Sequence, residues 1–270
     1  MVDTHLGEAE VTMTDQELAA RRAGGDERAT HRSLARLGAV GALGGAVLLF
    51  VSTLLHPLES DPNAPRAAFA EYAADSLWVW SHLGQFVGFA VLGMALVALA
   101  GTFEPGRAAA WARIGLAGAV ALIAVAAALQ AVDGVALKAM VDRWAAATGG
   151  VRVLAFEAAF AVRQIEIGLA SLLSLVSGLT LSVFGVAIVL STRYPRWLGG
   201  IGLLGGLGTV AAGAAQASTG FSDLAMNLSM LASSVLLIWA ILASVLMWRL
   251  VPRLAGHSDA ALQRFGKESG

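Results

Sequence analysis

Polar residues with paired helical spacing mark the ends of two long apolar segments. His82 and Gln85 lie three residues apart at the start of one segment, and Gln130 and Asp133 lie three apart at the end of the next. Side chains three apart share one face of a helix. Each pair therefore presents two polar groups in one direction, as a binding site or an acid–base site requires.

Other apolar segments add polar residues at the same level, whereas their opposite halves carry little that is comparable. Membrane-interface anchors are usually Trp, Tyr, Lys and Arg, but this layer is rich in His, Gln, Asp and Glu. Ionisable groups at membrane depth tend to face a bundle interior or a wet cavity. We expect an outward-facing pocket with a polar floor and an apolar wall; ion pairs that merely seal helix ends are the alternative. The candidate ligand-binding residues are His56, Trp78, His82, Gln85, Gln130, Asp133, Phe160, Arg163, Gln164, Glu166 and Asn227.

These residue types suit three kinds of function. The first is a membrane module that binds or moves a lipophilic or amphipathic small molecule. The second is a cofactor-independent enzyme acting on a lipid or isoprenoid-like substrate as a cyclase or isomerase. There Asp133 or Glu166, held protonated by partial burial, would be the general acid, and His82 or Gln85 would orient it. The third is a structural or assembly protein.

Several chemistries are disfavoured. The chain has no cysteine, so disulfides, thiolate metal sites and cysteine nucleophiles are excluded. His56 and His82 could ligate haem or a metal, but no further ligand spacing repeats, so we expect neither a metal nor a cofactor. The Gly200–Gly205 string matches a dinucleotide fingerprint but lies inside an apolar segment, and Gly202 and Gly206 fit helix packing instead. A net charge of −1 gives no basic surface for nucleic acid.

The elements that must position these residues are membrane helices. Hydrophobic residues make up 57% of the 270 positions and charged residues 14%, with a mean hydropathy of +0.71. Both departures from soluble proteins favour a chain solvated by lipid. We predict an all-α, polytopic membrane helix bundle. Six segments are long enough to span: about 34–55, 77–100, 111–132, 165–191, 197–218 and 226–248.

The Lys and Arg residues predict the orientation. They favour the two termini and the connections after the second and fourth segments, so both ends should be cytoplasmic. We expect a flexible tail over 1–32, a transmembrane domain over 33–250 and a second tail over 251–270. Thr14 and Glu17 could cap one short helix stopped by Gly24 and Gly25, or that tail could be disordered. Helical extensions over about 133–166 should form a small outer cap.

Three stretches are similar to a known family. Ala131–Lys138, Ala161–Gly168 and Tyr194–Gly199 resemble a widespread bacterial family of six-helix membrane proteins, catalogued only as a domain of unknown function. The resemblance covers roughly 33–250 and implies a bacterial plasma membrane. It carries no activity over and assigns no role to Asp133, Arg163 or Glu166. Membrane lipid is the expected partner, and the oligomeric state stays open.

Overall fold

Helices make up nearly all of the part of the chain that the computed structural model describes, residues 15–57 and 59–268, with side chains placed for 24–57 and 59–254. No strand occurs among those residues. The helices are α1 (Asp15–Leu54), α2 (Pro65–Ala74), α3 (Trp78–Ala100), α4 (Arg107–Gln130), the π-helix η1 (Ala131–Leu137), α5 (Lys138–Ala146), α6 (Gly149–Leu190), α7 (Arg196–Thr219) and α8 (Asp223–Glu268).

Six of the described helical stretches are long and apolar enough to cross a membrane. They are Gly24–Leu54, Trp78–Ala100, Arg107–Ala146, Gly149–Leu190, Arg196–Thr219 and Asp223–Leu254. Many of their large apolar side chains point away from the protein, as lipid-facing surfaces do. The predicted all-α bundle of six long apolar helices is confirmed, and the chain is a multi-pass membrane protein.

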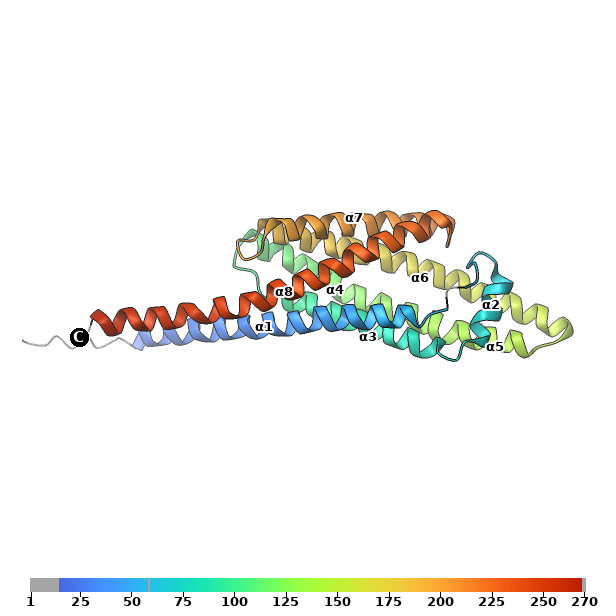
Figure 1. Cartoon of the computed structure of the whole chain (residues 1–270), viewed down its shortest axis with the longest axis horizontal. Coiled ribbons are helices and arrows are strands. Elements are labelled where there is room, and N and C mark those ends of the chain that lie inside the picture. Colours follow the sequence, from blue (N-terminus) through green and yellow to red (C-terminus); the bar gives the residue numbers. More distant parts are fainter. Residues whose placement is uncertain (1–14, 58, 269–270) are drawn as a thin grey trace, which may run out of the picture.

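The six long helices form a closed ring. Each packs on the next along the chain (α1 on α3, then α4, α6, α7 and α8), and α8 returns to pack on α1. Figure 1 shows α8 crossing the bundle diagonally, from α7 at one end to α1 at the other. The start of α1 and the end of α8 lie together at what we call the terminal end. Helices α2 and α5 lie at the opposite end, the hairpin end.

Close packing in the ring depends on glycine. A Cβ added at Gly178 would lie 2.5 Å from the carbonyl oxygen of Gly206, and one at Gly199 would lie 2.6 Å from that of Gly185. Such contacts are impossible for any other residue, so α6 and α7 approach backbone to backbone. Gly202 instead faces Trp239 of α8. The predicted packing role of Gly202 and Gly206 is confirmed.

The helices at the terminal end extend further than the sequence suggested. Residues 15–32 belong to α1, which passes through Gly24 and Gly25 without a break, and α8 continues beyond Pro252 to Glu268. Extending an existing helix adds one hydrogen bond per residue and needs no new nucleus. A long helix can therefore continue through residues that form helices poorly, such as Gly24 and Gly25. Thr14 and the rest of 1–14 lie outside the described residues.

At the hairpin end, α4 continues through η1 into α5, and the chain turns back at Gly149, which has a φ of +56°. The helical extensions expected over 133–166 are thus present. Helix α2 begins at Pro65, where a missing N–H costs nothing. A second apolar core joins α2 to the hairpin through the buried side chains of Phe69, Tyr72, Trp78, Leu137, Val141, Trp144, Ala155 and Ala159.

Candidate functional site

Two polar pairs join α3 to the end of α4. His82 Nε2 lies 3.0 Å from Asp133 Oδ2, and Gln130 Nε2 donates a hydrogen bond of 3.1 Å to Gln85 Oε1. The predicted i, i+3 spacing puts His82 and Gln85 on one face of α3, which faces the point where α4 passes into η1. These four residues, with Tyr72, Trp78, Arg163 and Glu166, form what we call the polar layer.

The close approach of the two helices has a local cause. A Cβ added at Gly134 would lie 2.4 Å from Cβ of His82, so only glycine allows α3 to pack here. Gly134 belongs to η1, and π-helical turns of this kind often occur at functional sites. The wider turn changes the direction of the residues after Gln130. Asp133 thereby meets His82, and its backbone oxygen accepts a hydrogen bond of 3.1 Å from Trp78 Nε1.

The hydrogen bonds of His82 fix how its ring is protonated. Nδ1 lies 2.6 Å from the carbonyl oxygen of Trp78, and a carbonyl can only accept, so Nδ1 carries a hydrogen. Nε2 then faces Asp133 Oδ2, and one further proton must lie on one of these two atoms to prevent repulsion. The contact does not have hydrogen-bond geometry, and it is an ion pair when the imidazole holds that proton. Either way, the pair holds one exchangeable proton and no net charge.

Aromatic rings cover this pair. His56, in the connection after α1, packs on Trp78 with ring centroids 4.9 Å apart, and Trp78 packs on His82 at 4.5 Å. Tyr72 of α2 lies 4.2 Å from Trp78 on the same stack. The rings therefore pack on one another and leave the imidazole of His82 only 1% exposed. Burial and the neighbouring His82 both lower the pKa of His56, which favours its neutral form.

A second buried charge pair lies on α6. Arg163 Nη1 is 3.4 Å from Glu166 Oε2 and donates a hydrogen bond of 3.0 Å to the Tyr72 hydroxyl. Its guanidinium also lies over the ring of Phe221, at 4.8 Å from the centroid. Arg163 thus connects α6 to α2 and to the connection between α7 and α8. Burial raises the pKa of Tyr72 despite the opposing charge of Arg163, so this hydroxyl stays protonated.

Several buried acceptors in the polar layer receive no hydrogen bond from a described residue, although one of them, Glu166 Oε2, has the ion pair with Arg163. Among the described residues, Gln130 Oε1, Asp133 Oδ1 and Glu166 Oε2 are buried and receive no hydrogen bond. Buried polar atoms are usually paired, and exceptions deserve an explanation because each costs free energy. The carboxyl groups of Asp133 and Glu166 also interact with each other electrostatically. The layer can therefore accept further hydrogens from a ligand or a substrate.

Three of the predicted residues do not join the layer. Gln164 and Asn227 are exposed, and Phe160 is 37% exposed, stacked on Phe156 with centroids 6.2 Å apart. Gln164 follows Arg163 on α6 and so points about 100° away from it around the helix axis. The other eight predicted residues lie in or beside the layer: His56, Trp78, His82, Gln85, Gln130, Asp133, Arg163 and Glu166.

Beside the layer, the ring of helices encloses a cavity of about 530 Å³, which we call the central cavity. Its walls come from α1, α3, α4, α6 and α8 and are almost entirely apolar. Gln85 belongs both to the polar layer and to this wall. The remaining polar groups on the wall are hydroxyls: Thr53, Ser177, Ser229, Ser233 and Ser234.

The cavity could not be predicted from the sequence. Its apolar lining residues resemble those of any membrane helix, and a cavity depends on which faces of several helices meet. The one available signal was the spacing of Ser229 and Ser233, which are four apart and share a face of α8. Serines in membrane helices also pack against neighbouring helices or donate a hydrogen bond to a carbonyl oxygen of their own helix. Ser234 does the latter, donating to the carbonyl oxygen of Met230.

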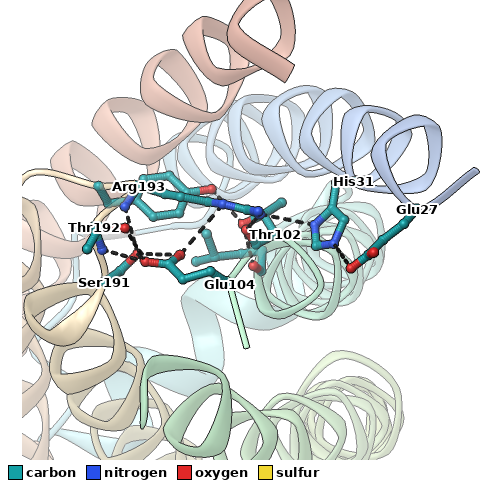
Figure 2. A network of polar contacts seen from close by, with 9 residues as sticks. Glu27, His31, Thr102, Glu104, Ser191, Thr192 and Arg193 are labelled. Carbon is teal, nitrogen blue, oxygen red and sulfur yellow. Dashed lines mark hydrogen bonds and ion pairs between the residues drawn. The ribbon is translucent and has the colours of Figure 1, made fainter. Parts of the chain in front are cut away.

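A separate polar network lies at the terminal end (Figure 2). The carboxylate of Glu104, between α3 and α4, accepts hydrogen bonds from the Thr192 backbone N–H at 2.6 Å and from the hydroxyls of Thr192 and Ser191. Arg193 Nε lies 3.6 Å from the same carboxylate. Burial alone would raise the pKa of Glu104, but the hydrogen bonds from Thr192 and Ser191 outweigh it and lower that pKa. We call this network the clasp.

The clasp also reaches the extension of α1. Arg193 donates to the carbonyl oxygen of Thr102 and contacts His31 Nδ1 at 3.1 Å, as Figure 2 shows. The Thr102 hydroxyl is 2.6 Å from that of Tyr194. Burial raises the pKa of Tyr194 to about 12, so it stays a neutral partner. Two connections far apart in the sequence are thereby joined to each other and to the extension of α1.

No group of three or more His, Asp or Glu side chains in the described part of the chain lies close enough to hold a metal ion. Comparison of the chain with protein-family models, with curated proteins and with solved structures finds no match. The function must therefore be argued from the geometry of the polar layer and the central cavity.

Proposed function

We propose that this protein is a membrane module that binds or moves a lipophilic or amphipathic small molecule. The observation that carries the proposal is the central cavity. Its volume of about 530 Å³ lies within the range of small-molecule sites, and its walls are apolar apart from a few hydroxyls and Gln85. An apolar surface with few, localised polar groups suits a ligand with an apolar body and one polar group.

The polar layer supports the proposal from one end of the cavity. Gln85 connects the two, since its side chain lines the cavity while its amide oxygen accepts from Gln130. Beyond this pair lie His82 and Asp133 with their exchangeable proton. A protein that moves its ligand could use that proton for coupling, and one that only binds would use the layer for polar contacts.

Filling the cavity tests the proposal. Ala240 is buried and lines the cavity, so Ala240→Phe should occupy ligand volume without exposing new surface. We expect lipophilic molecules extracted from the purified protein and measured by mass spectrometry to fall severalfold in this variant. Visible absorption of the same samples reports any haem. A haem signal would mean that the bound molecule is a cofactor and not a lipophilic ligand.

Ala117→Phe is the matched control, because Ala117 is exposed on α4 and lies outside the cavity lining. It should retain the extracted molecules at wild-type amounts. If Ala240→Phe folds normally and retains them equally, the cavity does not bind the ligand and the proposal fails.

An enzyme is the second candidate, favoured by the unpaired Oδ1 of Asp133 and by the buried carboxyl group of Glu166, which interacts with it electrostatically. In an isomerisation, one carboxyl would give a proton to a carbon of a double bond and the other would take one from a neighbouring carbon, so the composition is unchanged. Asp133→Asn and Glu166→Gln should then abolish turnover of lipid extracts while ligand retention persists. A binder would lose the ligand in these variants. If they alter nothing but stability, the polar layer is structural.

We further propose that the terminal end is cytoplasmic in a bacterial plasma membrane. The excess of Lys and Arg near the termini supports the orientation, and an even number of spans agrees with both ends on one side. The bacterial origin rests on the resemblance of Tyr194–Gly199 and the two other stretches to the six-helix family. Labelling of single introduced cysteines with an impermeant reagent would test the orientation, because the natural chain has none.

A further inference from the structure

We infer that the ligand of the central cavity is a lipid with an uncharged, hydrogen-bond-accepting polar group held by Gln85, and that it enters sideways between α1 and α8. This inference rests on the proposed function and adds the chemical class of the ligand and its route. Esters, ketones and hydroxyl groups on an apolar chain belong to this class.

The walls of the cavity argue for an uncharged polar group. None of its lining residues is charged. Gln85 follows Trp78, the first residue of α3, by seven positions, which places it about 10 Å along the helix. A charge at that depth without a counter-ion would be strongly disfavoured by desolvation, whereas a neutral polar group needs only a hydrogen-bond partner.

The free atoms of the cavity argue for an acceptor. Gln85 uses its oxygen to accept from Gln130, and its amide nitrogen donates to no atom in the described part of the chain. Two N–H groups are therefore free beside the cavity. Across it, neither Ser229 nor Ser233 makes a side-chain hydrogen bond to a described residue, so their hydroxyls can also bind the polar group.

The shape of the ring argues for lateral access. Phe50 and Thr53 on α1 and Met230 and Ser233 on α8 line the cavity and are nevertheless exposed, so the cavity opens between these two helices. Figure 1 shows why: α8 packs on α7 towards the hairpin end and reaches α1 only towards the terminal end. The opposite end of the cavity is closed by buried side chains, among them Met247. The opening therefore faces the acyl chains of one leaflet.

Fluorescence of the full chain in detergent tests the ligand class. Trp239 is 4% exposed and lines the cavity, whereas Trp248 on the same helix is 57% exposed and lies outside it. The probe is a monoacylglycerol with a dibrominated stearoyl chain, because bromine quenches indole fluorescence on contact. We expect saturable quenching that disappears in Trp239→Phe and persists in Trp248→Phe. Lysophosphatidylglycerol with the same chain, which carries a phosphate charge, should bind at least about tenfold more weakly.

A glutamine pair tests the polar contact. Gln85→Leu should weaken monoacylglycerol binding by about fivefold, the value of one hydrogen bond. Gln164→Leu is the matched control, because Gln164 is exposed and makes no such contact, and it should leave binding unchanged. Thermal unfolding of each variant shows that a loss of binding is not a loss of the fold.

A tryptophan pair tests the route. Ser233→Trp places a large side chain at the opening on an exposed position and should slow association of the probe several-fold. Leu231→Trp, on the same helix but outside the cavity lining, should not. Each variant is also made together with Trp239→Phe, and the quenching of that double variant is subtracted. The remaining signal then comes from Trp239 and not from the added indole.

The outcomes separate the inference from the proposed function. If both probes quench Trp239 equally, or if Gln85→Leu binds normally, the cavity binds lipids but the assigned ligand class is wrong. If Ser233→Trp leaves association unchanged, the lateral route is wrong. If no probe gives saturable quenching of Trp239, the proposed function itself fails.

Discussion

The clasp at the terminal end and the polar layer at the hairpin end both hold carboxylates among apolar helices. The two regions differ in how many hydrogen-bond donors surround those carboxylates. In the clasp, Glu104 accepts hydrogen bonds from Ser191 and Thr192 and pairs with Arg193. In the polar layer, Asp133 retains a buried oxygen with no partner among the described residues, and Glu166 Oε2 receives no hydrogen bond and has only the ion pair with Arg163. The clasp is also built from connections between helices, whereas the layer lies on the helices themselves.

We propose that this difference separates a structural network, the clasp, from a functional one, the polar layer. A buried network that is fully paired stabilises one arrangement of the chain. Unpaired acceptors reduce stability, and they are retained where a ligand, a water or a proton can use them. The position of the layer beside the central cavity, and of the clasp away from it, agrees with that division.

The largest effect should come from removing one partner of the buried charge pair on α6. Arg163→Met leaves Glu166 without its counter-charge in a buried site, which should cost about 3–5 kcal/mol of unfolding free energy. Denaturant unfolding in detergent measures it. The double variant Arg163→Met with Glu166→Gln should recover much of the loss. If the single variant is as stable as the wild type, the layer does not depend on paired charges.

A smaller effect should come from the packing of the layer. Gly134→Ala places a methyl group against His82 and should cost about 1–3 kcal/mol through overpacking. Gly168→Ala is the matched control in the same region, since a Cβ there meets nothing within 4 Å. It should stabilise the protein by about 0.5–1 kcal/mol, as Ala does in a helix interior. Equal responses of the two variants in thermal unfolding would contradict the close packing of α3 on η1.

Glu104→Gln in the clasp should lower the free energy of unfolding by about 1–2 kcal/mol, because charge-assisted hydrogen bonds become neutral ones. Its pH dependence sharpens the contrast. The pKa of Glu104 is lowered in the folded state, so its contribution is fully present above the unfolded value of about 4.5 and is lost as the pH falls below it. Wild type and variant should therefore converge in stability on acidification from pH 6. A constant difference down to the lowest accessible pH would show that the carboxylate charge is unimportant.

Part of the site could be predicted from local spacing. The i, i+3 pair His82/Gln85 had to share a face of α3. The spacing of Gln130 and Asp133 predicted a matching pair, but the π-helical turn after Gln130 also determines where Asp133 lies. Arg163 and Glu166 followed from the same rule. Gln164 and Asn227 were proposed only because they lie at the same depth in the membrane as the other polar residues. Depth does not determine which way a side chain points around the helix axis.

Other features could not be read from the chain. Glu104 and Arg193 looked like ordinary interface charges, and only the approach of two connections separated by more than eighty residues makes them a clasp. The extension of α1 through Gly24 and Gly25 also escaped local reasoning, because helix propagation from a long span outweighs two weak positions.

The sequence by itself determined that this is an all-α bundle with six long apolar helices, because apolar length and the need to satisfy every backbone group leave the helix as the available element. It also determined which faces carry polar pairs. Only the tertiary structure decided that α8 crosses from α7 to α1 and so leaves a cavity beside Gln85. That crossing depends on glycine contacts and side-chain packing between distant segments, which no local pattern specifies.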